Sequence, residues 1–290
     1  METMPNPVGD RLVEIGQDLF QAPKQFVEFT KVREADVLLN DIEEHPHAFV
    51  LACVMDRQVI AERAWLIPYR ILKEKGDFSF DALSILSLDD IRERMSKPEP
   101  LHRFVDAMSR YFFLGITRIK DFYQGDASRI WAGKPASAEV VYRFLEFEGV
   151  GPKIASMAVN ILAREFKIPF SDYFSIDISA DVHVRRVFSR LGLCTKDPTV
   201  EQVIYKARAL FPEFPGLMDF PCWEIGRQWC KPKNPECGAC HMNDICPTAI
   251  GSSGRAPIGV KPRAPIGVKP KSTHRGQTYT GCCPIELPRF

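Results

Sequence analysis

The chain has 290 residues, 45% hydrophobic and 26% charged, which is enough to bury one large core or two moderate ones. No apolar run approaches the ~20 residues of a membrane span, and the N-terminus carries no obvious targeting peptide. Of the net charge of +1, residues 251–290 carry +6 and the rest −5. This excludes a uniformly basic nucleic-acid binder, so we expect any nucleic-acid surface on the body to be a local patch.

Regular helical periodicity runs through most of the chain. Apolar residues recur every three to four positions in five segments, which span 9–20, 34–46, 48–72, 101–125 and 137–149. Ser87 and Ser137 stand where helix N-caps are expected. The nearest candidate for a strand is 78–85, which runs directly into the first of these caps. We therefore predict an all-α protein with short connections.

A glycine-rich turn joins two predicted helices within residues 144–162. Gly149 and Gly151 permit a tight turn around Val150, and Pro152 suits the first position of the second helix. The pattern indicates a helix–hairpin–helix, whose backbone N–H groups can hold a DNA phosphate through a bound monovalent cation. A plain helical hairpin with a glycine turn is the alternative.

Four cysteines gather in one short segment near the C-terminus. They are Cys230, Cys237, Cys240 and Cys246, with the spacing C-x6-C-x2-C-x5-C. Four soft thiolates suit zinc or an iron–sulfur cluster. Structural zinc sites usually have two tight cysteine pairs, whereas only one pair is tight here, which favours one compact cluster. A disulfide knot is the other alternative, and it is disfavoured because the chain looks intracellular. Cys53 and Cys222 lie among apolar residues and are interpreted as core.

The segment after the cysteines has a different composition. Residues 255–270 repeat RAPIGVKP twice, and they are rich in Pro, Gly and Lys without a helical period. We predict a disordered basic tail over 249–290. It is either an appendage that grips a nucleic-acid strand or a product of duplication or readthrough.

The hairpin and the cysteine motif, in this order, resemble endonuclease III of the helix–hairpin–helix DNA glycosylase superfamily. The likeness covers roughly 35–248. It implies a two-domain all-α glycosylase fold with a [4Fe-4S] cluster on the four cysteines near the C-terminus. The domains expected from it are an N-terminal helical extension (1–34), a helical domain with the hairpin (35–164), an iron–sulfur domain joined by N-terminal helices (165–248) and the tail (249–290).

The resemblance also implies two catalytic residues. Lys153 stands where the bifunctional members, which remove the base and also cleave the strand, carry a lysine. Asp181 is the first residue of the family's D-x-H-x-x-R-V pattern. Asp177 is the wrong candidate, because the histidine of that pattern does not follow it. An amine can attack C1′, and a carboxylate can stabilise an oxocarbenium-like transition state. The alternatives are a phosphate-binding role for Lys153 and a helix N-cap for Asp181. We expect His183 to be packed and hydrogen-bonded.

DNA contacts are expected at six positions. They are Gly149, Val150 and Gly151 of the hairpin and Arg227, Lys231 and Lys233 around the cysteines. The chain departs from the family in three ways, which limit how far the family's properties can be assigned to it. The body is slightly acidic, and Lys153 and Asp181 are 28 positions apart. Val54 or Met55 stands where the family carries a glutamine that fills the gap left by the flipped base. Gln58 follows one turn later.

These features predict a bifunctional DNA N-glycosylase and AP lyase of base-excision repair. Its partner would be double-stranded DNA with a damaged base or an abasic site, and its expected substrate is an oxidised pyrimidine. A deaminated or methylated base is one alternative, and a non-catalytic iron–sulfur module that binds DNA is another. We expect a monomer that does not contact membranes and works in the cytoplasm or nucleoid, with the nucleus also open.

Overall fold

The computed structural model describes residues 6–74 and 76–253, and within these ranges it contains helices and no strand. The all-α prediction is thus confirmed. The strand candidate 78–85 is wrong: α6 (Phe80–Ser84) forms there, because Ser79 caps the helix by accepting a hydrogen bond from Ala82 N–H at 3.2 Å. In the described part, no helix combines the length and the apolar character needed to cross a membrane.

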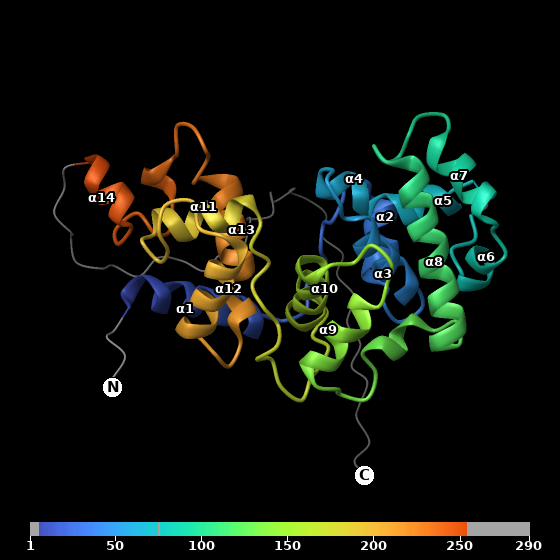
Figure 1. Cartoon of the computed structure of the whole chain (residues 1–290), viewed down its shortest axis with the longest axis horizontal. Coiled ribbons are helices and arrows are strands. Elements are labelled where there is room, and N and C mark those ends of the chain that lie inside the picture. The colour runs from blue at the N-terminus through green and yellow to red at the C-terminus, as the bar shows by residue number, and fades with distance from the viewer. Residues whose placement is uncertain (1–5, 75, 254–290) are drawn as a thin grey trace, which may run out of the picture. The chain divides into compact units, whose positions relative to one another are not determined.

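A first hydrophobic core takes its buried side chains mainly from residues 35–176. The helices that build it are α2 (Arg33–Asn40), α3 (Pro46–Met55), α4 (Ala61–Trp65), α5 (Ile67–Leu72), α6, α7 (Leu88–Ser96), α8 (Val105–Tyr123), α9 (Ser137–Leu145) and α10 (Pro152–Arg164). All ten residues of α3 are buried, and its neighbours α8, α4 and α5 surround it. Figure 1 shows α2–α8 grouped on one side of α10.

Two local predictions in this part need correction. The periodic segment 48–72 is three helices, because the chain turns after α3 with Gln58 at a positive φ of 51°. Ser87 caps α7 through a capping box with Asp90, as predicted for the cap. Ser137 is not an N-cap. It is the first residue of α9, and its hydroxyl donates to Asp172 and accepts from Ser175 N–H, which ties α9 to the segment after α10.

A second hydrophobic core joins the two ends of the described chain. Its buried residues run from Ile178 to Met242 and include Val8 and Leu12 from the N-terminal helix. The helices around it are α1 (Pro7–Gln21), α11 (Val182–Arg190), α12 (Val200–Leu210), α13 (Asp219–Gln228) and α14 (Pro247–Ser253), with the 3-10 turn η2 (Pro215–Met218). The predicted domain boundaries at 34 and 164 remain predictions, although Phe166 and Phe170 pack in the first core.

The predicted tail begins too early. Residues 249–253 belong to α14, where Ala249 is buried and Thr248 donates to the carbonyl of Arg190 at 2.7 Å. The remainder of that prediction, 254–290, lies outside the described residues. By contacts the chain divides into the units Met1–Val260 and Lys261–Phe290, and only the first holds described residues.

Helix α10 connects the two cores. It packs against α9 and α3 of the first group and against α1 and η2 of the second. Its buried face includes Ala155, Ala158 and Leu162, all fully buried. Because α10 is fixed from both sides, the residue at its exposed start has a well-defined position. That residue is Lys153.

Candidate active site and cysteine-lined cavity

The hairpin turn between α9 and α10 needs glycine at one position for conformational reasons. Gly149 has a φ of +89°, and a Cβ there would lie 2.8 Å from the ring of Tyr111. Gly151 is extended, with φ −107° and ψ 177°, and a Cβ there would meet nothing within 4 Å. Gly149 is therefore required by the fold, whereas Gly151 leaves open space in front of α10.

The start of α10 carries no side-chain cap. Gly151 is its N-cap residue, Pro152 is its first residue and Lys153 its second. The uncapped first turn presents backbone N–H groups and the positive end of the helix dipole, which favour an anion. The predicted hairpin residues Gly149, Val150 and Gly151 thus lie directly beside the predicted nucleophile.

A bracing contact fixes the hairpin from the side of α3. Arg57 Nη1 donates to the carbonyl of Gly149 at 2.9 Å, and the guanidinium lies over the ring of Tyr111, 5.6 Å from its centroid. The carbonyl of Arg57 in turn lies 2.9 Å from Nε2 of His102. The loop after α3, the hairpin and the start of α8 are therefore linked by one arginine.

Asp181 is the N-cap of α11. Its Oδ1 accepts hydrogen bonds from His183 N–H at 2.8 Å and Val184 N–H at 2.9 Å. Asp181 is therefore the N-cap of α11, as the alternative interpretation predicted. Its other carboxylate oxygen, Oδ2, takes no part in these two hydrogen bonds. His183 is packed and bonded as expected: Arg186 Nη2 lies 3.0 Å from its Nδ1, and a Cβ on Gly226 would lie 2.7 Å from its side chain.

The rejected candidate Asp177 is engaged elsewhere. Both of its carboxylate oxygens accept from the guanidinium of Arg208, at 2.7 and 2.8 Å. Such a bidentate pair leaves the carboxylate little freedom to serve a site. The sequence pattern that favoured Asp181 over Asp177 thus agrees with the contacts each residue makes.

Two further carboxylates share the surroundings of Lys153 and Asp181. Burial raises the pKa of Asp56, while the charge of Lys153 lowers it and that of Asp181 raises it. Burial raises the pKa of Asp219 to about 7, with Arg164 and Lys153 acting against the rise and Asp181 adding to it. Because Lys153 and Asp181 act on the same two carboxyl groups, all four residues form one electrostatic site.

Sequence reasoning missed Asp56 and Asp219. Asp56 directly follows α3, one residue after the positions where a glutamine was sought, and Asp219 begins α13 in an otherwise apolar stretch. A lone carboxylate beside a buried run is the signal that could have identified both. Val54 and Met55 are fully buried and cannot contact DNA, whereas Gln58 is exposed at the turn after α3.

The long spacing between Lys153 and Asp181 is filled by an ordered segment, 165–180. Phe170 and Ile176 are buried in the first core, and the carbonyl of Ile176 accepts from Gly216 N–H at 2.7 Å. The segment then returns to the site at Ser179.

Ser179 bridges the site. Its N–H donates to Asp219 Oδ1 at 2.8 Å, and its hydroxyl donates to the carbonyl of Lys153 at 3.0 Å. Ser179 itself is 6% exposed. The first turn of α10 is thereby connected through one serine to the first residue of α13.

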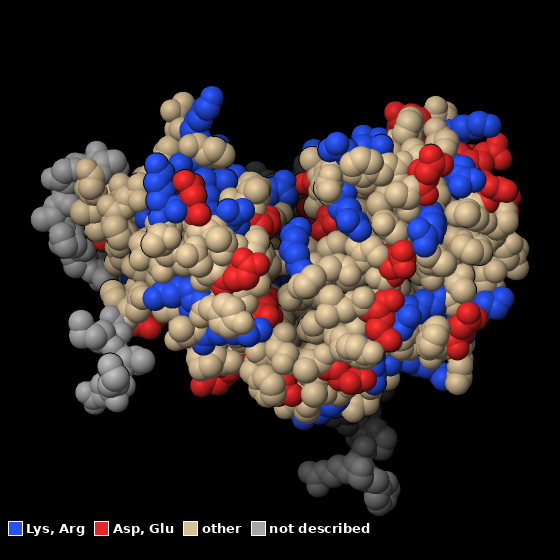
Figure 2. All heavy atoms as spheres, viewed as in Figure 1, with Lys and Arg blue, Asp and Glu red and all other residues tan. Residues whose placement is uncertain are grey.

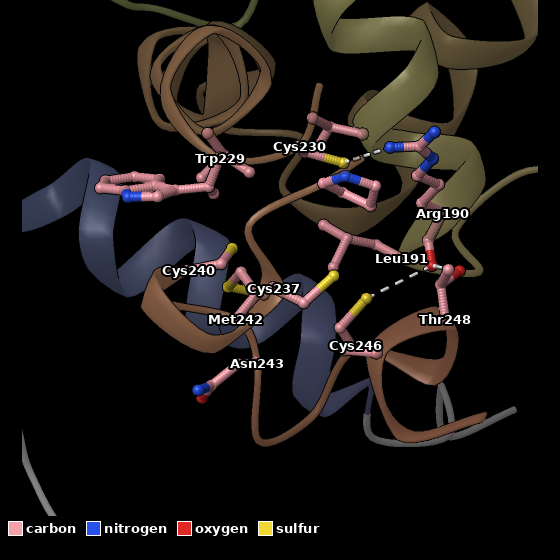
Figure 3. A pocket seen from close by; sticks show the side chains of 14 residues that line it. Arg190, Leu191, Trp229, Cys230, Cys237, Cys240, Met242, Asn243, Cys246 and Thr248 are labelled. Atoms are coloured by element: carbon pink, nitrogen blue, oxygen red, sulfur yellow. Dashed lines mark hydrogen bonds between the residues drawn. The ribbon is translucent and has the colours of Figure 1, made fainter. Parts of the chain in front are cut away.

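The four predicted cysteines line one cavity of about 30 Å³ (Figure 3). Trp229, Met242 and Leu191 supply apolar walls, and none of the four cysteines is in a disulfide. Burial raises the pKa of Cys240 to about 11, and the neighbouring cysteines add to the rise. Among the described residues, no three His, Cys, Asp or Glu side chains converge tightly enough to hold a single metal ion.

The surroundings of this cavity are suited to thiolate ligands. Arg190 Nη1 lies 3.4 Å from Sγ of Cys230, a charge-assisted contact to sulfur. The same guanidinium donates to the carbonyls of Lys231 and Pro232 at 2.7 and 2.9 Å, which holds the start of the cysteine loop against α11. The donor set of one buried and three half-buried thiols with a nearby cation therefore fits a sulfur-ligated group.

Basic side chains gather around α11 and α13, on the left of the face shown in Figure 2. Two of the three predicted DNA contacts there already have acidic partners. Arg227 donates to Glu62 at 2.9 Å, and Lys231 donates to Glu236 at 2.5 Å. Lys233 is exposed at the tip of the loop. A phosphate would have to displace those two carboxylates.

Known proteins resemble the chain in both sequence and fold. No family model matches it. It is 31% identical to endonuclease III of Thermotoga maritima over 157 residues, covering 52% of this chain and 64% of that protein. It is 32% identical to endonuclease III-like protein 1 of Gallus gallus over 115 residues, covering 38% of this chain and 36% of that protein. The chain thus spans less than two thirds of the length of these relatives.

Three solved structures share the fold. A non-covalent endonuclease III–DNA complex matches with a TM-score of 0.55 at 18% identity, over 86% of this chain and 98% of that one. A thermostable thymine-DNA glycosylase matches with a TM-score of 0.56 at 14% identity, over 85% and 98%. A trapped endonuclease III–DNA covalent intermediate matches with a TM-score of 0.50 at 19% identity, over 75% and 94%.

The fold is therefore that of the helix–hairpin–helix DNA glycosylases. Within this class, the sequence likeness is to endonuclease III.

Proposed function

We propose that the chain is a base-excision DNA glycosylase with AP lyase activity that works inside the cell. The observation that carries this proposal is the position of Lys153. It lies in the uncapped first turn of α10, next to the hairpin, and its charge acts on the same carboxyl groups as that of Asp181. A protein that only binds DNA has no need of a lysine among aspartates at this point.

The proposed reaction begins with attack by the Lys153 amine on C1′ of the damaged nucleotide. The C–N glycosidic bond breaks, and the base leaves with its bonding electrons and a proton. The C1′–O4′ bond then breaks as the nitrogen lone pair forms a Schiff base with C1′, and O4′ takes a proton from solvent. Loss of a C2′ proton from this Schiff base expels the 3′ phosphate by β-elimination. At a preformed abasic site, the same amine condenses with the aldehyde and releases water.

Asp181 is the proposed electrostatic partner in the first step. Two backbone N–H groups hold its Oδ1, so the carboxylate needs little reorganisation when positive charge develops on the sugar. The hairpin would hold a phosphate beside the flipped nucleotide through its backbone, without reading sequence. A monovalent cation bound by the hairpin would strengthen this contact. Equal DNA affinity in potassium and choline salts would exclude the cation.

The proposed partner is double-stranded DNA with a damaged base or an abasic site. The endonuclease III whose structure resembles this chain is known in complex with DNA and as a trapped covalent intermediate. The proposed substrate is an oxidised pyrimidine, with deaminated or methylated bases as alternatives. Gln58, exposed beside the hairpin-bracing Arg57, is the proposed residue that fills the gap left by the flipped base.

We infer that the cysteine-lined cavity holds a [4Fe-4S] cluster through Cys230, Cys237, Cys240 and Cys246. Four thiols around one cavity, with Arg190 beside one of them, support this ligand set. When bound, the cluster would fix the basic loop that contains Lys231 and Lys233. Binding of iron requires thiolates, so loading of the cavity releases protons from the buried thiols.

Metal analysis of anaerobically purified protein tests the cluster. We expect about four irons per chain and broad visible absorption. Cys237→Ser should lower iron content and soluble yield, whereas Cys194→Ser, a cysteine outside the cavity, should leave both unchanged. Stoichiometric zinc without iron would contradict the proposal.

Borohydride trapping tests the activity. Purified protein is incubated with duplexes that each carry one defined lesion or an abasic site, and the reduced adduct is measured. Lys153→Gln should abolish the adduct and strand cleavage but retain most duplex binding, while the exposed control Lys196→Gln should resemble the wild type. A normal adduct from Lys153→Gln would move the nucleophile to another lysine. Tight lesion-independent binding by the wild type without any adduct would favour a non-catalytic DNA-binding module.

A further inference from the structure

A buried polar connection runs from α13 to the start of α10, and its carboxylate end has no role in the proposed reaction. Asp219 Oδ1 accepts from Ser179 N–H, and Ser179 Oγ donates to the carbonyl of Lys153. Ser179, at the centre of the connection, is 6% exposed, and both of its bonds are at least partly buried. Hydrogen bonds of this kind are strong determinants of local geometry, because breaking them leaves a buried polar atom unsatisfied.

The same carboxyl group belongs to the electrostatic site. The charges that act on Asp219 are Lys153 and Arg164 from α10 and Asp181 from the start of α11. On its own helix, Cys222 faces it, and burial raises the pKa of that thiol well above its usual range, so it stays neutral. Arg164 is already paired with Glu165 at 2.7 Å. Asp219 therefore has no dedicated counter-ion in this set.

We propose that Asp219 is a positioning residue of this site: it fixes the first turn of α10 through Ser179 and sets the charge around Lys153 and Asp181. The inference rests on the proposed function of Lys153 as the nucleophile. It adds the first residue of α13 to a machinery otherwise supplied by the hairpin and the start of α11.

The charge effect has a definite direction. Burial raises the pKa of Asp219 to about 7, so the group is protonated below neutrality and ionised above it. A neutral Asp219 leaves Lys153 flanked by fewer anions. An ionised Asp219 adds a negative charge beside the lysine that must act as the nucleophile, and that charge opposes its attack on C1′. Ionisation of Asp219 should therefore hold back the rate in alkaline solution.

Three variants distinguish the effect of Asp219 on the position of the first turn of α10 from its effect on the charge around Lys153. Asp219→Asn keeps an oxygen that can accept from Ser179 N–H but cannot ionise. Ser179→Ala removes the hydroxyl bond to the carbonyl of Lys153 and leaves the charges unchanged. Glu224→Gln is the matched control, because Glu224 is a second carboxyl on α13 whose burial raises its pKa, and Arg164 is the one charge that acts on it.

The measurement is the single-turnover rate of borohydride trapping on a duplex with a preformed abasic site, from about pH 5.5 to about pH 9. Full-length, iron-loaded protein is used in excess over DNA, so that changes in affinity do not affect the rate. We expect Asp219→Asn to match the wild type at about pH 6 and to be roughly threefold to tenfold faster at about pH 8. Ser179→Ala should be slower at every pH without displacement of the profile.

Two results would overturn the inference. One is an Asp219→Asn profile that has the shape of the wild-type profile, whether at full or reduced height. The other is a Glu224→Gln profile displaced as far as that of Asp219→Asn, because the displacement would then follow any carboxyl on α13. A wild-type protein that gives no adduct at any pH would instead refute the proposed function, so the two failures are distinguishable.

Discussion

At the scale of the residue, Asp181 caps α11 and is proposed to stabilise the transition state, and a single substitution can separate these two roles. Asn caps helices about as well as Asp, so Asp181→Asn should keep α11 intact while it removes the charge. We expect base excision to slow by roughly a hundredfold or more, because the charge directed at the transition state is lost. Single-turnover assays on a lesion duplex measure this loss, and melting temperature checks the fold.

The lyase step should be spared more than excision, since no glycosidic bond remains at a preformed abasic site. Asp177→Asn is the matched control, because that carboxylate pairs with Arg208 away from the site. Equal slowing on both substrates would show that Asp181 acts on Lys153 chemistry and not on the departing base.

The raised pKa of Asp219 also predicts how the stability of the fold depends on pH. Its pKa is raised to about 7 by burial, so the folded protein holds a proton that the unfolded chain releases near pH 4. Stability from this group should therefore fall as the pH rises from about 4 to about 7. Asp219→Asn should raise the melting temperature over the wild type more at pH 8 than at pH 4. An equal difference at both values would mean that the carboxyl is not desolvated in the folded state.

At the scale of the element, the two glycines of the hairpin should respond differently to substitution. Gly149→Ala should lower the melting temperature, because of its φ of +89° and the ring of Tyr111 2.8 Å from a Cβ. Gly151→Asp should fold normally, because the position is open and Asp is a favourable N-cap. Its new charge should nevertheless weaken binding to lesion and plain duplex alike, and less so at high salt.

Fluorescence anisotropy at two salt concentrations, with thermal melts of both variants, measures these effects. Unchanged DNA affinity and salt dependence in Gly151→Asp would reduce the hairpin to a structural turn. Loss of folding in that variant would instead show that the space before α10 is filled in the native protein.

Periodicity predicted most helices because burial of one face is a local property of the sequence. The errors arose where a tertiary contact decided the outcome. Ser137 looks like a cap, but its hydroxyl satisfies Asp172, 35 positions later. The segment 78–85 alternates like a strand but is capped into a helix by Ser79. Neither partner can be identified from neighbouring residues alone.

The residues of the candidate site also differ in whether a local pattern or a tertiary contact identifies them. Lys153 and Asp181 could be proposed from the sequence because each is embedded in a local motif, and their catalytic roles remain predictions. Asp56 and Asp219 could not, since each enters the site through packing between distant helices, and the bridge through Ser179 spans 40 positions to Asp219. A carboxylate gains such a role from its three-dimensional surroundings, and these cannot be read from a single sequence.

At the scale of the whole molecule, charge is divided between a slightly acidic body and a basic C-terminal segment. Residues 254–290 lie after α14 and carry seven Lys or Arg and one acid. Truncation after Ser253 should therefore preserve the fold and the trapping rate on short duplexes. Non-specific DNA affinity should fall at low salt and change little at high salt. Melting curves and a salt titration test this, and a truncated protein that does not fold would refute it.

The N-terminal helix α1 has a consequence for how this chain acquires its structure. It is synthesised before the residues that it packs against, because the side chains that bury Val8 and Leu12 come from residues beyond 177. Its end is also held late, by the ammonium of Lys167 on the carbonyl of Phe20 at 2.7 Å. Such long sequence separation slows folding. The first core can form during synthesis, whereas the second must wait until the helices beyond residue 177 have been made, and until then the apolar face of α1 lacks its native partners.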